Sequence, residues 1–204
     1  MSAFAPELAR SEVTVPLSSF IRPHHAHYFS GRRDRPHFRH RQYSFPGIPT
    51  LLPLVRAFLD TCALTVSSSI DSQDSQDSRE YRYLFTLLGS ELATNAIQHS
   101  RSGEAGGSFT LVVRRSCEGL HLTCKDHGSP RGVGSPDSAG STVPMPREPL
   151  SADPSGLKHD HESGRGLALV NALATSWGDN AQPELRKVWF FLARDLDGNP
   201  WSQA

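Results

Sequence analysis

The chain has 204 residues, and its 21 Lys and Arg are balanced by 21 Asp and Glu, so the formal net charge is zero. This length suits one domain with tails, and the absence of net positive charge argues against nucleic acid as the main partner. Hydrophobic residues make up only 37% of the chain, which predicts that part of it is loop or tail.

Cysteine usage and hydropathy indicate a cellular compartment. Cys62, Cys117 and Cys124 form no metal-binding spacing, and three sparse cysteines suit a reducing cytoplasm. Met1–Arg10 lacks the apolar region of a signal peptide, and no apolar run is long enough to span a bilayer. We therefore expect a soluble, cytoplasmic protein without a membrane partner.

Residues 1–42 differ in composition from the rest of the chain. Ser30–Gln42 contains five arginines interleaved with histidines, and no helical or strand period is sustained there. We expect a basic, disordered N-terminal tail, with an anionic docking arm or a weak metal site as the alternative. Ser67–Ser78, with its Asp-Ser-Gln repeat, is predicted to be a mobile connector.

Two helices are predicted in the first half of the chain. Thr50–Leu64 follows the turn cluster Phe45–Pro49 and has apolar residues at helical spacing. Arg79–His99 also has an apolar face, but Glu91 and Asn95 fall on or beside that same face. Polar groups on a core-facing arc either pair locally or mark a functional site, because burying an unpaired charge costs free energy.

Strands dominate the second half. Alternation predicts strands over Ser108–Arg115 and Leu120–Lys125, a further strand over Lys187–Arg194, and a helix over Gly164–Trp177, while Arg39–Phe45 is open as an extra strand. This order predicts an α/β two-layer sandwich with helices on one face of a mixed, mainly antiparallel sheet. The expected organisation is a tail (1–42), a domain (43–194) with a long lid (129–163), and a C-terminal tail (195–204).

Three short motifs occur in order: Glu91–Ser100 (ELATNAIQHS), Asp126–Gly128 (DHG) and Gly164–Leu167 (GRGL). No P-loop signature accompanies them. The three motifs resemble the N box and the two glycine boxes of the GHKL (Bergerat-fold) ATPase superfamily, which includes histidine-kinase catalytic domains and gyrase. Together with Phe45-Pro46-Gly47, they are most similar to the anti-sigma-factor serine/threonine kinases of actinobacterial type. The resemblance covers about residues 43–194.

The resemblance implies roles for the first two motifs. Asn95 would hold Mg²⁺ through its amide oxygen, since this cation prefers oxygen ligands. Glu91 would orient or deprotonate an attacking hydroxyl or water. Asp126 would accept a hydrogen bond from the adenine amine, and Gly128 would allow the backbone to approach the base. The implied cofactors are ATP and Mg²⁺.

The third motif would bind the phosphates. Gly164 and Gly166 would free backbone N–H groups at the start of the third helix, and Leu167 completes the motif. Arg165 and Lys158 would add positive charge, or would be solvated residues of the lid.

The resemblance implies a regulatory kinase that transfers the γ-phosphoryl group of ATP to Ser or Thr of an anti-sigma-factor antagonist and so controls a sigma factor. The alternatives are a non-catalytic, nucleotide-dependent anti-sigma binding protein and, ranked last, a detached histidine-kinase catalytic domain. A homodimer stays open, and binding to nucleic acid through the tail is a weak alternative.

Overall fold

The computed structural model describes residues 16–29, 38–64, 76–128, 150–151, 165–182 and 184–203. The remaining segments include most of the expected lid, Lys158 and Gly164, so the predictions made for them lie outside the described residues.

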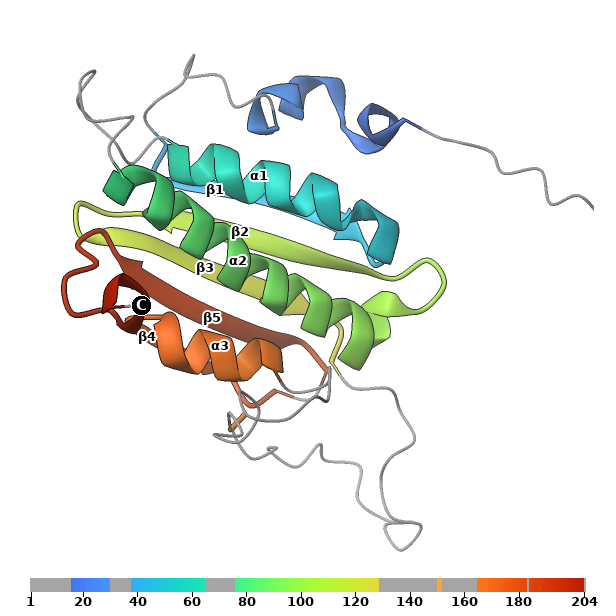
Figure 1. Cartoon of the computed structure of the whole chain (residues 1–204). Helices are drawn as coiled ribbons and strands as arrows, with labels where there is room; N and C mark the ends of the chain where they lie inside the picture. Colours follow the sequence, from blue (N-terminus) through green and yellow to red (C-terminus); the bar gives the residue numbers. More distant parts are fainter. Residues whose placement is uncertain are drawn as a thin grey trace, which may run out of the picture.

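Five antiparallel strands form one sheet in the order β1-β2-β3-β5-β4 (Figure 1). Their bounds are β1 His40–Pro46, β2 Ser108–Arg115, β3 Gly119–Asp126, β4 Ser176–Asp179 and β5 Arg186–Ala193. Alternating burial in β1, where Arg41, Tyr43 and Phe45 face inward, matches the period of a half-buried strand.

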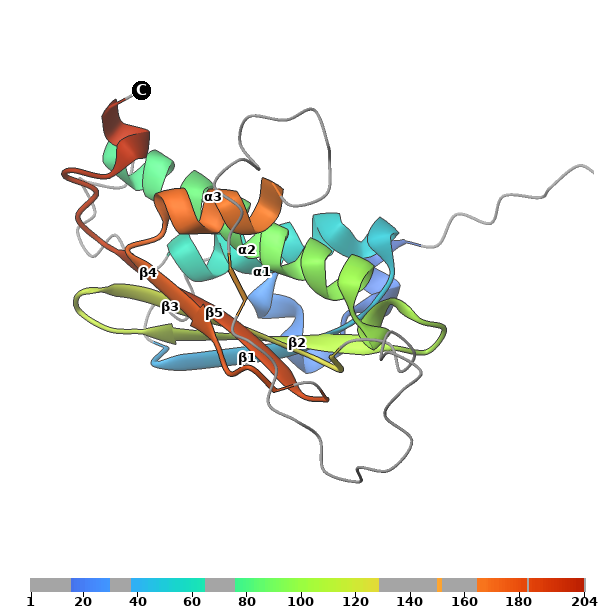
Figure 2. The same ribbon diagram turned by 90° about the horizontal axis from the view of Figure 1, so that it is seen from below.

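Among the described residues, three α-helices lie on one face of this sheet and none covers the other face (Figures 1 and 2). They are α1 Leu52–Leu64, α2 Gln76–His99 and α3 Arg165–Leu173. The arrangement confirms the predicted α/β two-layer sandwich. Within the described part of the chain, no helix combines the length and the hydropathy that crossing a bilayer requires.

The core lies between the helices and the sheet. Its largest fully buried side chains are aromatic: Phe45, Phe58, Phe85, Phe109 and Phe190. Tyr81 of α2 ties two strands together, because its hydroxyl accepts from the Leu120 backbone N–H (3.1 Å) and donates to the Leu192 carbonyl (3.0 Å). The helix that carries Glu91 and Asn95 is therefore fixed on the sheet by both apolar packing and polar contacts.

Two element boundaries differ from prediction by three residues or more. α2 begins at Gln76, inside the predicted connector, where Gln76 donates a hydrogen bond to Glu80 (2.7 Å) and Asp77 favours the helix start through the macrodipole. α3 ends at Leu173 instead of Trp177, and β4 follows at once. Four residues at a sheet edge are too few to show a periodic pattern in the sequence, so β4 was missed.

Parts of both expected tails contact the domain. Two short 3₁₀ turns, η1 (Leu17–Phe20) and η2 (Pro23–Tyr28), precede the first strand. Tyr28 and Phe29 pack against the core and are partly buried there. The sequence did not predict this contact, because the segment 1–42 was judged by its many arginines and histidines. Near the C-terminus, Asn199 donates to the Leu173 carbonyl at the end of α3 (2.8 Å).

Candidate nucleotide site

The site begins with Glu91 and Asn95, which lie one turn apart on α2 and face the start of α3. Gly166 of α3 comes so close that a methyl group on its Cα would lie 2.8 Å from Glu91 Oε2 and 3.4 Å from Asn95 Nδ2. A side chain at position 166 would therefore require the Glu91 carboxylate to move. The structure thus brings together three of the residues predicted for the site, from two of the three motifs.

Glu91 is in an environment that disfavours its charge. Burial raises the pKa of its carboxyl, and the positive charge of Arg56 on α1 opposes this shift. No described residue forms a salt bridge with Glu91. A desolvated carboxylate is a stronger base than a solvated one, which is the property that proton abstraction requires.

Asn95 carries an unsatisfied polar atom. Its Nδ2 is buried and has no hydrogen-bond partner among the described residues, an arrangement that costs free energy in an isolated protein. A phosphate oxygen would satisfy this donor, and the Oδ1 of the same amide is the kind of ligand that Mg²⁺ prefers. The orphaned amide of Asn95 therefore fits a bound phosphate, and the oxygen of the same side chain fits a metal ion.

Asp126 ends β3 and is 4% exposed. Its Oδ1 accepts from the Gly128 backbone N–H (2.7 Å), and its Oδ2 accepts from Arg186 Nε (3.0 Å) in a buried salt bridge. Gly128 has a φ of +69°, a backbone conformation that favours glycine. Each carboxylate oxygen keeps a second lone pair, so Asp126 can also accept from an exocyclic amine.

The first two motifs are joined by hydrogen bonds. The 3₁₀ turn η4 (Arg101–Gly103) follows α2, and the Arg101 N–H donates a hydrogen bond to the Gly128 carbonyl (2.8 Å). The His127 N–H donates to Ser102 Oγ (3.0 Å), and Ser100 Oγ donates to the Ala96 carbonyl (2.6 Å). The end of α2, the end of β3 and the start of α3 lie at the same end of the sheet (Figure 1).

The remaining predicted residues are placed less centrally. Arg165 is exposed as the first residue of α3, and Leu167 is half-buried and packs against the core. Leu167 therefore helps to hold α3 on the core, and its role toward the nucleotide stays a prediction. Gly164 lies outside the described residues.

Sequence reasoning missed Arg186, Ser102 and Arg56. Arg186 stands directly opposite Asp126 in the β3–β5 register, a relation between residues 60 positions apart that no local pattern reveals. Ser102 follows the first motif closely, and its hydroxyl could have been considered as a cap. Arg56 lies on the polar side of an ordinary amphipathic helix.

Comparison with known proteins agrees with this geometry. The family model for the histidine kinase-like ATPase domain matches residues 50–190, which include α1, α2, all three motifs and most of β5. The chain belongs to this family, and the match supports an ATP-binding regulatory role within the GHKL superfamily. No curated protein matched the chain as a relative.

Proposed function

We propose that the protein is a Ser/Thr protein kinase that binds MgATP and phosphorylates an anti-sigma-factor antagonist, thereby controlling a sigma factor. One observation carries the proposal: a desolvated Glu91 and the orphaned Asn95 amide converge on the backbone of Gly166. A base at Glu91 and an oxygen ligand at Asn95 would lie side by side, next to the motif that resembles a phosphate-binding turn.

The roles follow from the positions of the side chains. Asn95 would hold Mg²⁺, which when bound neutralises phosphate charge. Asp126, oriented by Arg186 and Gly128, would accept from the amine of adenine. Glu91 would take the proton of the acceptor hydroxyl, and the backbone at Gly166 would approach the phosphates closely. Transfer of this kind depends on positioning and charge stabilisation.

Calorimetric titration of ATP, with and without Mg²⁺, tests the nucleotide site. We expect Mg²⁺-dependent binding by the wild type and a loss of about a hundredfold or more in Asn95→Ala and Asp126→Asn, because a site built for hydrogen bonds rejects a mismatched partner strongly. Thr123→Val is a matched control, since Thr123 lies on the opposite face of β3. A folded wild type that binds no ATP would contradict the proposal.

Transfer is tested separately with γ-labelled ATP and a purified anti-sigma-factor antagonist. We expect Glu91→Gln to keep ATP binding and to slow phosphorylation by about 10²- to 10⁴-fold, the usual contribution of a general base. Phosphoamino-acid analysis should find the label on Ser or Thr. Normal transfer by this variant would exclude Glu91 as the base.

A second candidate is a non-catalytic binding protein whose affinity for a sigma factor depends on the nucleotide. Leu150, a described residue within the expected lid, donates its N–H to Asp179 Oδ1 of β4 (3.3 Å), which gives the lid a connection to the sheet. ATP binding without transfer, together with nucleotide-dependent partner affinity, would favour this candidate. Equal affinity with ATP, with ADP and without nucleotide would exclude it.

The detached histidine-kinase domain ranks last. His24, His25 and His27 lie in η2, a 3₁₀ turn of six residues, and His25 stacks on Tyr28 with ring centroids 4.9 Å apart. A phospho-accepting histidine on a dimerisation helix needs a longer α-helix. Label appearing on one of these histidines would restore this candidate.

A further inference from the structure

No described α-helix covers the face of the sheet opposite α1, α2 and α3 (Figure 2). The strand register and the burial pattern give this face a distinct set of side chains. The strand register sorts its outward-facing residues into three rows that cross the sheet, each row made of direct cross-strand neighbours. The first row is His40, Arg114, His121 and Phe191, the second is Gln42, Val112, Thr123 and Trp189, and the third is Ser44, Thr110, Lys125 and Lys187. We call this surface the open face.

Charge on the open face is of one sign. The first row carries Arg114 and two histidines, and the third carries two lysines, whereas none of the outward-facing residues in the five described strands is Asp or Glu. The middle row is uncharged. Rows one and three are four residues apart along each strand, which corresponds to about 13 Å. Two cationic rows therefore flank an uncharged lane.

Two lysines of the open face are placed where their charges reduce the stability of the isolated protein. Lys125 and Lys187 stand directly opposite each other on β3 and β5, and both are exposed. Like charges directly opposite in a sheet are destabilising. Arg114 stands opposite His121 on β3, and burial together with the Arg114 charge lowers the pKa of this imidazole, which favours its neutral form. Anionic groups beside the two lysines would remove the repulsion between them.

The uncharged lane contains an aromatic platform. The Trp189 ring stacks on His121 with centroids 5.3 Å apart and an interplanar angle of 18°. Gly178 on β4 leaves room for the Trp189 indole, since a methyl group there would lie 3.1 Å from Cζ2. Trp189 is half-buried, and Phe191 follows two residues later on the same face.

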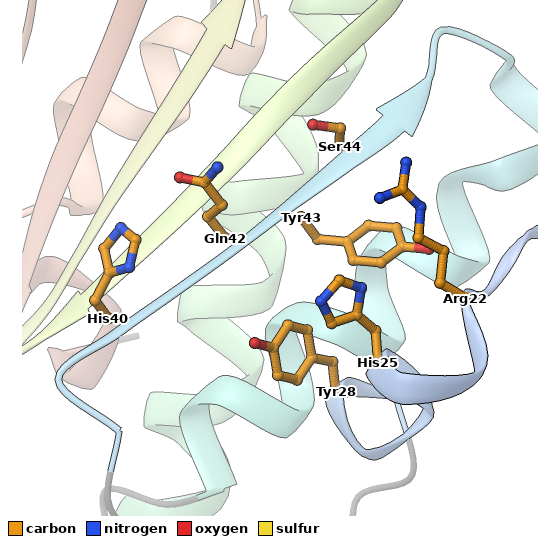
Figure 3. Close-up of a pocket in the computed structure, with 7 residues that line it drawn as sticks. All are labelled: Arg22, His25, Tyr28, His40, Gln42, Tyr43 and Ser44. Atoms are coloured by element: carbon orange, nitrogen blue, oxygen red, sulfur yellow. The ribbon is translucent and has the colours of Figure 1, made fainter.

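A pocket of about 330 Å³ extends the open face around the free edge of β1 (Figure 3). Its lining includes Arg22 and His25 from the η2 region, and His40, Gln42 and Ser44 from β1, with no carboxylate among the lining residues. The Nδ1 of His25 is buried and has no hydrogen-bond partner in the part of the chain that the structure describes. The pocket thus resembles the open face, because positive or polar groups lie beside aromatic rings in both.

We propose that the open face binds single-stranded nucleic acid, with phosphates along the two cationic rows and bases on the lane that contains Trp189. Stacking on aromatic rings beside a positively charged track is how single strands are bound without sequence preference. A second copy of the chain is disfavoured, because two cationic faces would repel each other. An acidic protein would satisfy the charges but would not need the flat Trp189–His121 stack.

The test uses fluorescence anisotropy with a labelled single-stranded oligonucleotide of mixed sequence and the full chain. We expect binding that weakens with salt, and a slope in log affinity against log salt that falls by about 0.7 in Lys125→Ala and again in Lys187→Ala. Trp189→Ala should weaken binding about tenfold, and Trp189→Phe should restore most of it. Arg79→Ala removes an exposed positive charge on α2 and should leave the slope unchanged.

Three results would overturn the proposal. The first is absence of binding at low salt by the folded wild type. The second is loss of binding in Asp126→Asn or with saturating ATP, which would place the oligonucleotide in the nucleotide site. The third is equal binding of poly-L-glutamate with no effect of Trp189→Ala, which would indicate an acidic protein partner. Because the open face and the nucleotide site lie on opposite sides of the sheet, this proposal stands or falls independently of the kinase proposal.

Discussion

The two faces of the sheet differ in how their charged side chains are exposed to water and paired. On the face covered by the helices, polar side chains are shielded from water: Glu91 is half-buried without a salt bridge to any described residue, and the buried Asp126 has one described cationic partner, Arg186. On the open face, several positive side chains stay exposed and have no acidic neighbour on the described strands. The covered face is suited to a small ligand with a metal ion, and the open face to an extended anion.

This difference also shows that a net charge of zero is compatible with a strongly charged surface. The balance of 21 basic and 21 acidic residues argues against nucleic acid only if the charges are mixed over the surface. In the folded chain, the strands place Arg114, Lys125 and Lys187 together on one side. The distribution of charge, and not its sum, determines which partners a surface attracts.

The largest expected effect comes from breaking the covered face alone. In Gly166→Ala, the new methyl group would meet Glu91 Oε2 at 2.8 Å and push the carboxylate out of position. Since small displacements of a catalytic group reduce rates strongly, we expect transfer to fall by about a hundredfold. Steady-state transfer measures this, and oligonucleotide anisotropy serves as the control. Reduced oligonucleotide binding would show that the two faces are coupled.

The second prediction concerns the buried salt bridge of the covered face. Arg186→Met leaves the Asp126 carboxylate buried with only the Gly128 N–H as a described partner. Breaking a buried pair in this way costs about 3 kcal/mol, which chemical denaturation at neutral pH would measure. Lys187→Met, one residue away on the open face, is the matched control and should cost far less. Equal losses would mean that the salt bridge contributes little.

Most of the fold could be predicted from the sequence, because it depends on local periodicity. Strand β2 was predicted with its observed bounds, and α2 was predicted to within three residues of its start. The two-residue period of β1 and the 3.6-residue period of α2 can each be recognised within one continuous segment of the sequence. β4 was missed because its four residues carry no such period.

The site was predicted less completely, because it depends on pairings between distant segments. Glu91 and Asn95 could be identified as polar groups on an apolar helix face, and Gly166 as part of a glycine-rich turn. The contact of Gly166 with both side chains, and the position of Arg186 opposite Asp126, depend on how α3 and β5 pack. The roles assigned to all these residues are still predictions.

The third prediction tests how the helical layer is attached to the sheet. Tyr81→Phe removes the hydroxyl that joins the Leu120 N–H and the Leu192 carbonyl, and leaves both without that partner in a buried setting. We expect a loss of about 1–2 kcal/mol in the free energy of unfolding. Tyr83→Phe, on the exposed side of the same helix, should be nearly neutral. A loss as large in Tyr83→Phe would assign the effect to α2 itself.

The smallest expected effect concerns the stability cost of Glu91. Burial raises its pKa above the ordinary value of 4.5, so the folded chain binds this proton more tightly than the unfolded chain. Stability therefore falls as pH rises from about 4.5 through the folded-state pKa. Glu91→Gln removes this penalty, and we expect the variant to be more stable than the wild type at neutral pH.

Unfolding midpoints measured from pH 4 to pH 8 would check this sign. The advantage of Glu91→Gln should shrink as the pH falls and vanish below the ordinary pKa of the carboxyl, where both folded and unfolded wild type are protonated. Glu118→Gln changes an exposed carboxylate in the β2–β3 turn and is measured alongside as the control variant. A variant that is more stable but inactive would show that the covered face keeps a charge that folding disfavours. Such a charge is explained by function, since a residue that served only packing would be replaced by its neutral isostere without loss.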